Sequence, residues 1–495
     1  MWLWPISTAA VYLCLLGVLS VFAVHRFFLA LAVRRQAVAD VTPPIEWPSV
    51  LVQLPLYNER NVAQRVVDAV CALDYPHGRL SIQVLDDSTD GTSQLVGKRV
   101  RFWADRGCAI VHMRRRHRAG FKAGALGAGL RRSNAALVAI FDADFVPAAD
   151  FLRRLVPHFG DDRVGMVQAR WGHLNRYQDA FTHAQSILLD GHFANEHGGR
   201  QARGCYFNFN GTAGIWRRAC IDDAGGWSGR TLTEDLDLSY RAQLRGWRFV
   251  YCSDVQVDAE LPATVEAFKL QQHRWAKGSV ETAKILLPQI WRSPIGLKRK
   301  RDATFHLLGN LAYPFVLLLA LLMPVAMSLR LEEPSPVSWV IDLVLLSMST
   351  CTLIWFYGVA LIRVGADWRC LWRIPFALAI GAGLAVNNSR GLMEALLGRT
   401  SEFCRTPKVG RGAFHTDRGP IRKGALGQAL LELGVGTSVV LAVWLALIGG
   451  RPLAVPFLAL FASGFLFLGG STVWAAACYH RDARREGKTL TAPLT

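Results

Sequence analysis

The sequence predicts an α/β domain with a doubly wound, mostly parallel sheet, joined to a bundle of membrane-spanning α-helices. Three observations carry this prediction. Segments typical of strands and of helices alternate between residues 49 and 290, as they do in a parallel sheet covered on both faces. Long apolar runs before and after this part could each cross about 30 Å of hydrocarbon as a helix. Charged motifs fall at the ends of the predicted strands, where such sheets bind ligands.

Five long apolar runs are the predicted membrane spans. They lie at residues 6–24, 307–328, 337–362, 430–449 and 453–477. The chain then divides into an anchor at 1–35, the α/β domain at 49–290, a helix pair at 305–363, a connecting region at 370–425, a second helix pair at 429–477 and a cytoplasmic tail at 478–495.

The apolar stretch 371–386 is the ambiguous part of the membrane half. Arg373, Pro375 and two glycines interrupt it. If it crossed the bilayer, the basic segment 390–423 would lie outside, against the excess of Lys and Arg in cytoplasmic loops. We therefore expect an interfacial or re-entrant helix here, which leaves five true spans.

The net charge of +18 indicates a membrane surface and not a nucleic-acid partner. The basic residues flank the apolar runs on one predicted side, as after the first run, before the second and after the last. We expect a multi-pass protein of the cytoplasmic (inner) membrane, with the α/β domain in the cytoplasm. The ten cysteines form no C-x-x-C pair, so neither a zinc site nor a disulfide framework is indicated.

The α/β part can be followed element by element. Strands are predicted at residues 49–54, 80–85, 108–112, 136–141 and 164–168, and helices begin near 62, 92, 121, 177, 233 and 262. Thr233 has the side chain of a helix N-cap. Since parallel strands end at one edge of a sheet, the motifs that follow them should meet there.

Asp142 and Asp144 follow the predicted strand 136–141 directly. In an extended segment, residues two apart point the same way, so the two carboxylates can converge on one point. Their mutual repulsion is relieved by a divalent cation that also carries substrate phosphates. The alternative is a solvated turn after a buried strand.

Five motifs in order resemble those of a known enzyme family. They are Pro55-x-Tyr57-Asn58-Glu59, Asp86-Asp87, Asp142-x-Asp144, Thr233-Glu234-Asp235 and Gln271-Gln272-His273-Arg274-Trp275. This set is similar to the processive membrane family 2 glycosyltransferases, which include cellulose synthases and cellulose-synthase-like mannan and glucan synthases. The segment 207–214 and the Gln-Gln-His-Arg-Trp form are closest to the cellulose-synthase-like members. The resemblance covers about residues 50–407.

The resemblance implies a GT-A domain that binds a nucleotide sugar. Asp86 and Asp87 would contact the base and ribose, and Tyr57 and Glu59 would belong to the same site. For the aspartate pair, the alternative is a turn capped by Asp.

The diphosphate part of this implied site is cationic. Asp144, helped by Asp142, would hold Mg²⁺ or Mn²⁺ on the diphosphate. Lys122, at the start of a helix after a basic turn, would add a second positive charge to the same phosphates.

Asp235, with Glu234 beside it, is the expected catalytic base. An inverting displacement needs one carboxylate that takes the proton from the acceptor hydroxyl. The alternative is that both side chains only favour the positive N-terminus of a helix, and the two interpretations are compatible.

The acceptor side would be formed by the last motif and by a glycine turn. Helical spacing brings Gln271, Arg274 and Trp275 to one face, where Arg274 can pair with diphosphate and Trp275 can support a sugar ring. Gln272 would supply further hydrogen bonds, and Asn210 and Gly211 would border the acceptor. The alternatives are an aromatic and basic belt at the membrane interface and a structural turn.

The segment 401–408 is similar to the gating loop of the cellulose-synthase group, and its alternative is a plain connector. The function implied is an inverting β-glycosyltransferase that polymerises hexose into an exported or cell-surface polysaccharide. UDP-glucose is favoured as donor over GDP-mannose or UDP-N-acetylglucosamine. The alternatives are transfer of one sugar to a membrane lipid and a nucleotide-sensing transporter. The partners would be the donor, a glycan acceptor and the bilayer, with accessory export or regulatory subunits also allowed.

Overall fold

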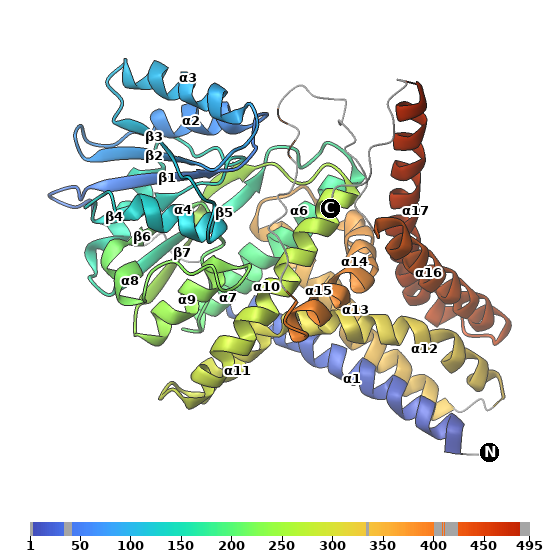
Figure 1. The fold of residues 1–495 in the computed structure, drawn as a ribbon. Coiled ribbons are helices and arrows are strands. Elements are labelled where there is room, and N and C mark those ends of the chain that lie inside the picture. The colour runs from blue at the N-terminus through green and yellow to red at the C-terminus, as the bar shows by residue number, and fades with distance from the viewer. Residues whose placement is uncertain are drawn as a thin grey trace.

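The computed structural model describes residues 3–33, 42–332, 336–399, 408, 410 and 424–485. Figure 1 shows the sheet and its helices on one side and the long apolar helices on the other. Helix α10 (Val265–Arg292) runs between these two parts and carries the Gln-Gln-His-Arg-Trp motif.

Seven strands form one mixed sheet within the described residues, in the order β3-β2-β1-β4-β6-β5-β7. Their bounds are β1 Val50–Leu56, β2 Leu80–Asp86, β3 Ile110–Arg114, β4 Leu137–Ile140, β5 Val164–His173, β6 Gly214–Arg217 and β7 Arg248–Ala259. Strand β6 is antiparallel to β4 and β5, and the other neighbours are parallel. The predicted α/β class with a mostly parallel sheet is confirmed.

Helices cover both faces of this sheet. Those of the α/β domain are α2 Ala63–Cys71, α3 Thr92–Ala104, α4 Phe121–Leu130, α5 Phe151–Leu155, α6 Ala180–Asp190, α7 Gly198–Ala202, α8 Arg218–Asp223 and α9 Glu234–Leu244, with a 3-10 turn at Val156–Gly160 and a π-helical turn η2 at Gly191–His197. The doubly wound arrangement follows from strand periodicity, because alternate side chains of β1 enter different cores.

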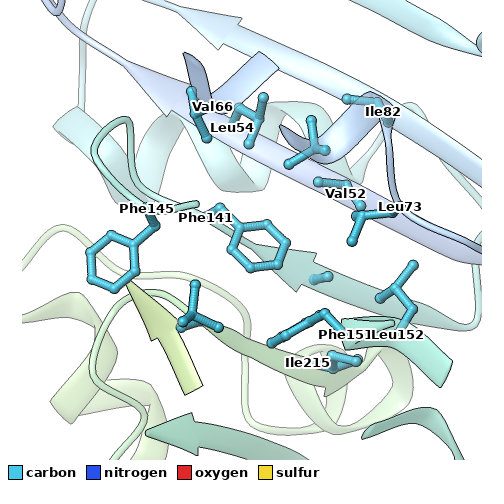
Figure 2. Close-up of a cluster of buried hydrophobic side chains, with 14 of the residues drawn as sticks. Val52, Leu54, Val66, Leu73, Ile82, Phe141, Phe145, Phe151, Leu152 and Ile215 are labelled. Carbon is cyan, nitrogen blue, oxygen red and sulfur yellow. The ribbon is translucent and has the colours of Figure 1, made fainter. Parts of the chain in front are cut away.

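One of these cores lies between the sheet and helices α2 and α3. Figure 2 shows Val52 and Leu54 of β1 with Val66 of α2, and Phe141 beside Phe151. Burying one such side chain is worth about 1.5–3 kcal/mol. Phe141 is the last apolar residue before Asp142, so the buried strand end fixes where the first carboxylate of the Asp-x-Asp motif emerges.

Long apolar helices make up the remainder of the described chain. They are α1 Leu3–Ala32, α12 Ala312–Glu332, α13 Pro336–Arg363, α16 Ala425–Ile448 and α17 Val455–Arg485, with α11 Leu297–Leu307 and short 3-10 turns at Gly309–Leu311 and Pro452–Ala454 between them. Six segments of the described residues are long and apolar enough to cross a membrane. The chain is thus a multi-pass membrane protein.

The sixth candidate segment, Trp368–Leu396, contains the stretch expected to be interfacial or re-entrant. It is not one continuous helix, because a 3-10 turn at Trp368–Arg373 leads into α14 (Ile374–Gly383), which breaks at Leu384 before α15 (Ala385–Leu396). At 1.5 Å per residue, α14 is about 15 Å long, half of a hydrocarbon core. The count of five spans stays a prediction.

Candidate active site

A cavity lies at the edge where β1, β2 and β4 end. Nearly all of the candidate site residues line it: Tyr57, Glu59, Asp87, Lys122, Asp142, Asp144, Asn210, Gly211, Glu234, Asp235, Gln271, Arg274 and Trp275. Two do not, namely Asp86 and Gln272. The parallel register of β1 with β2 and β4 brings these segments together, since it sets Leu56 opposite Asp86 and Gln53 opposite Ile140.

Lys122 is the centre of charge in this cavity. Its Nζ lies 2.5 Å from Asp142 Oδ1, 2.9 Å from the carbonyl oxygen of Gly211 and 3.9 Å from Glu234 Oε1. Burial lowers the pKa of Lys122, but the negative charges of Asp142, Glu234 and Asp235 raise it by more than burial lowers it. The resulting pKa lies above the usual lysine value. The ammonium therefore stays charged and holds one carboxylate of the Asp-x-Asp motif.

Asp144 is met by a second lysine from a distant part of the chain. Lys408 Nζ lies 2.7 Å from Asp144 Oδ2 and donates to the carbonyl oxygen of Glu260 at 2.6 Å. Lys408 ends the segment expected to act as a gating loop, and residues 401–407 of that segment lie outside the described residues. The Asn61 amide holds the Lys408 carbonyl at 3.2 Å, so the backbone there is tied to the cavity rim.

A divalent cation could bind to the carboxylates of Asp142 and Asp144 only if a substrate completed its coordination. The described residues contain no cluster of three or more His, Cys, Asp or Glu side chains that could hold a metal by themselves. Mg²⁺ commonly takes one or two carboxylates, with phosphate oxygens and waters supplying the remainder. Each carboxylate of the pair now faces an ammonium group, which shows that positive charge is accommodated at both. Asp142 and Asp144 thus suit a cation shared with a diphosphate.

Asp86 and Asp87 are neighbours in sequence but have different surroundings. Asp87 lines the cavity and forms a two-pronged ion pair with Arg115, at 3.0 Å and 2.6 Å. Asp86 is buried and accepts hydrogen bonds from His112 at 2.9 Å and from Ser88 at 2.9 Å, as well as from Ser93.

The surroundings of Asp86 set its ionisation. Burial raises the pKa of Asp86, but the hydrogen bonds from His112, Ser93 and Ser88 outweigh burial and lower the pKa to about 2. In this structure the Asp86 carboxylate links β2, β3 and α3.

Asp235 occupies the first turn of α9, where it lines the cavity. Burial and the neighbouring Glu234 raise the pKa of Asp235 to about 7, although Lys122 opposes this rise. A carboxylate with a pKa near neutrality can accept a proton and still release it, as a general base requires. Thr233 is at the N-cap position as expected, but its side chain makes no cap hydrogen bond and instead lies 3.2 Å from Thr282 Oγ1.

Helix α10 presents three residues of its motif to the cavity at the expected spacing, Gln271, Arg274 and Trp275. His273, in the same motif, turns away and pairs with Glu394 of α15 at 3.2 Å. Thr264 begins the helix as its N-cap and accepts from the Ala267 amide at 3.2 Å.

Sequence analysis missed several residues of the cavity wall. Trp171 and His173 line the cavity because β5 continues past Gln168 to His173. Their alternation with Gly172 is a strand signal that could have extended the prediction. Arg118, whose guanidinium lies 3.3 Å from the Tyr57 ring centre, carries no such local signal. For Lys408 the sequence indicates only the gating-type segment 401–408, and not the contact with Asp144.

Comparisons with known proteins agree with this geometry. Residues 48–278 match the family model described as glycosyltransferase like family 2. Over these residues the α/β domain is similar to family 2 glycosyltransferases. Glucomannan 4-beta-mannosyltransferase 2 of Arabidopsis thaliana is 47% identical over 252 residues, which are 50% of this chain and 47% of that protein. Glucomannan 4-beta-mannosyltransferase 1 of Oryza sativa subsp. japonica is 45% identical over 254 residues, or 50% and 48% of the two chains. The resemblance to cellulose-synthase-like enzymes is thereby confirmed.

The chain spans about half the length of these curated relatives. Among solved structures, the glycosyltransferase fold is similar to that of mannosyltransferase PcManGT from Pyrobaculum calidifontis, in complex with GDP-Man and Mn²⁺. The TM-score is 0.54 at 20% identity, and the match covers 79% of this chain and 100% of the other. This likeness confirms the GT-A type of fold.

Proposed function

We propose that the protein transfers mannosyl units from GDP-mannose to a growing β-linked polysaccharide, with inversion at the transferred carbon. The observation that carries the proposal is the meeting of three groups in one cavity: the carboxylates of Asp142 and Asp144, the Asp235 carboxyl with its raised pKa, and the Trp275 ring. The carboxylates of Asp142 and Asp144 suit a cation bound to a diphosphate. The Asp235 carboxyl suits a proton acceptor, and the Trp275 ring suits contact with a sugar ring.

The donor preference departs from the one expected from sequence. The motifs of the sequence favour UDP-glucose, but both relatives at 45–47% identity bear the name of mannosyltransferases, which does not support glucose. Of the donors considered, GDP-mannose is the one that carries a mannosyl group.

In the proposed reaction, Asp235 takes the proton of the acceptor hydroxyl as its oxygen bonds to the anomeric carbon of the donor. The bond from that carbon to the diphosphate breaks, and the nucleoside diphosphate leaves with the electron pair. A bound Mg²⁺ or Mn²⁺ would neutralise charge on the diphosphate. Lys122, at 2.5 Å from Asp142, holds positive charge on the same side, and Arg274 lines the same cavity.

The proposed site of reaction is the cytoplasmic face of the inner membrane. Helix α10 lies between the glycosyltransferase domain and the apolar helices, so Trp275 would present the acceptor end close to the bilayer. A product that leaves the cavity there would be near the membrane helices.

A screen of nucleotide sugars tests the proposal. Purified full-length protein with Mn²⁺ or Mg²⁺ should release GDP from GDP-mannose faster than it releases UDP from UDP-glucose or UDP-N-acetylglucosamine. Sizing of radiolabelled product should give a ladder or an insoluble polymer. A single product soluble in organic solvent would instead indicate a lipid acceptor, and absence of transfer from every donor would contradict the enzyme assignment.

A further inference from the structure

The side-chain amide of Asn210 is hydrogen-bonded through its nitrogen, whereas its carbonyl oxygen has no hydrogen-bond partner within the described residues. Its Nδ2 lies 3.0 Å from His192 Nε2, and its backbone amide donates to Gln168 Oε1 at 3.1 Å. The carbonyl oxygen Oδ1 is buried at the wall of the cavity, and no hydrogen-bond partner for it exists within the described residues. A buried acceptor without a partner is costly, by about 1–3 kcal/mol, unless a ligand or water completes it.

Asn210 adjoins the atoms assigned to the chemistry. The carbonyl oxygen of the next residue, Gly211, accepts from Lys122 Nζ at 2.9 Å. A Cβ atom added to Gly211 would lie 3.0 Å from Asp235 Oδ2, so this turn touches the proposed base. Asn210 therefore lies in the part of the cavity wall next to Lys122 and Asp235.

The orientation of the Asn210 amide depends on the tautomer of His192. An amide nitrogen only donates, so His192 Nε2 must be the acceptor and its proton must be on Nδ1. His192 Nδ1 lies 3.2 Å from Glu196 Oε2, and a carboxylate only accepts, which requires the same tautomer. The two contacts are thus consistent with one another and keep the Asn210 carbonyl directed away from His192.

Glu196 is in turn held by the first membrane helix. Arg26 of α1 pairs with Glu196 Oε1 at 3.0 Å, and Arg200 lies 3.4 Å from Oε2. Burial raises the pKa of Glu196, but Arg26, His192 and Arg200 lower it well below its usual range. Glu196 therefore stays ionised.

The backbone that carries His192 and Glu196 is clamped against the membrane helices. Both residues lie in the π-helical turn η2, a rare geometry that occurs often at functional sites. A Cβ on Gly191 would lie 2.5 Å from the Tyr357 ring of α13, and one on Gly199 would lie 2.3 Å from the Leu29 carbonyl oxygen of α1. The close approach on both sides fixes the turn relative to the bundle.

We propose that His192 is a positioning residue, which fixes the Asn210 carboxamide so that its carbonyl oxygen accepts a hydrogen bond from a hydroxyl of the acceptor sugar. Glu196 and Arg26 complete the arrangement and link it to helix α1. The inference rests on the proposed function, because it assigns the acceptor side of that same reaction.

A double-mutant cycle of His192 and Asn210 tests the inference in the full-length protein. The acceptor probe is a short β-linked manno-oligosaccharide at varied concentration, with saturating donor. His192→Leu is expected to raise the acceptor KM about tenfold, equivalent to about 1.4 kcal/mol, with the donor KM changed less than twofold. The ratio of donor hydrolysed to sugar transferred should rise as well, because a misplaced acceptor leaves water to react.

The decisive comparison is made in the Asn210→Ala background. If His192 acts through Asn210, His192→Leu adds no further loss there. His192→Gln should retain most transfer, since its carbonyl can accept from Asn210 and its amide can donate to Glu196. His183→Leu, which replaces a buried imidazole on the preceding helix, is the control and should leave the acceptor KM unchanged.

Equal losses from His192→Leu in both backgrounds, or a donor KM that shifts as much as the acceptor KM, would overturn the inference and indicate a merely structural role. Nucleotide affinity measured for each variant identifies any that fails to fold, and the cycle then uses His192→Ala in place of His192→Leu. If the wild-type protein transfers sugar from no nucleotide donor, the proposed function fails instead, and the two failures are distinguishable.

Discussion

Asp86 and Asp235 have pKa values displaced in opposite directions from that of an ordinary aspartate. Asp86 is surrounded by hydrogen-bond donors, which lower its pKa to about 2 despite burial. Asp235 is buried beside Glu234, which raises its pKa to about 7. The two shifts predict different pH behaviour and different responses to the same isosteric substitution.

Transfer should depend on the ionisation of Asp235. Because the base acts only when deprotonated, kcat/KM is expected to rise about tenfold per pH unit up to about 7 and to level off above it. Asp235→Asn should lower kcat by at least about 100-fold, the lower range for loss of a general base. A pH profile with radiolabelled donor measures both effects, and near wild-type transfer by the variant would refute the assignment.

The stability of this variant serves as its control. Since the folded-state pKa of Asp235 lies above the ordinary aspartate value of 3.8, the stability this group contributes is lost as pH rises through about 7. Asp235→Asn cannot ionise, so at pH 8 it should melt at the same temperature as the wild type or higher. A clear drop in Tm would attribute its inactivity to misfolding.

Substitution of Asp86 should mainly lower the stability of the protein, and substitution of Asp87 should mainly weaken donor binding. The pKa of Asp86 is depressed, so its contribution to stability is present above the ordinary aspartate value of 3.8 and is lost only as pH falls through about 2. At pH 7, Asp86→Asn should therefore destabilise the protein by about 2 kcal/mol and lower Tm by several degrees. Asp87→Asn should leave Tm nearly unchanged and weaken nucleotide binding. Thermal melts measure the change in stability, and nucleotide titrations measure the change in donor affinity. A large drop in Tm for Asp87→Asn together with an unchanged Tm for Asp86→Asn would contradict the roles given to the two residues.

Helix α10 is the element that connects the cavity to the membrane helices. It presents Gln271, Arg274 and Trp275 to the cavity, while Lys269, two residues before Gln271, is buried on the opposite side. Lys269 Nζ lies 2.6 Å from Glu432 Oε2 of α16 and 2.8 Å from Thr472 Oγ1 of α17. These buried contacts fix the position of α10 relative to α16 and α17.

Removing one partner of this pair should cost more than removing both. Glu432→Ala leaves the Lys269 ammonium buried without its carboxylate, which costs about 3–5 kcal/mol. The double variant Lys269→Met with Glu432→Leu leaves no buried charge and should be less destabilised than either single change. Thermal melts in detergent test this order. Leu430→Ala, exposed on the same helix, is the control and should be close to the wild type.

At the scale of the whole molecule, three contacts bear on how the chain crosses the bilayer. At the end of α13, Arg363 binds Asn195 of the glycosyltransferase domain. After α15, the Arg399 carbonyl oxygen accepts from Lys277 Nζ at 2.6 Å, and Lys408 reaches Asp144 at 2.7 Å. Both ends of the intervening segment contact the same domain, as a re-entrant or interfacial path for α14 and α15 requires, and the count of five spans stays a prediction.

Labelling of introduced cysteines should test the span count. In a cysteine-free background, Arg399→Cys and Leu426→Cys are expected to react with an impermeant maleimide from the side of the glycosyltransferase domain. Leu453→Cys, in the turn between α16 and α17, should react from the opposite side. If the segment crosses the bilayer, all three positions exchange sides.

The amino-acid sequence alone predicts the local structure and the chemistry that each segment can offer. Apolar periodicity indicated the strands, the covering helices and the apolar spans, because burial of one face is encoded within a few neighbouring residues. The order of the acidic and aromatic motifs predicted which side chains would gather at the strand ends, and the structure places nearly all of them in one cavity.

Only the tertiary structure decided which partners these side chains have. That Asp86 binds His112 while Asp87 binds Arg115, that Lys408 reaches Asp144, and that His192 orients the Asn210 amide all depend on segments far apart in the chain. Strand alternation predicts that two adjacent aspartates point to opposite faces, but not which of them faces the ligand. Distances between remote segments are set by packing of the whole fold, and local patterns do not contain them.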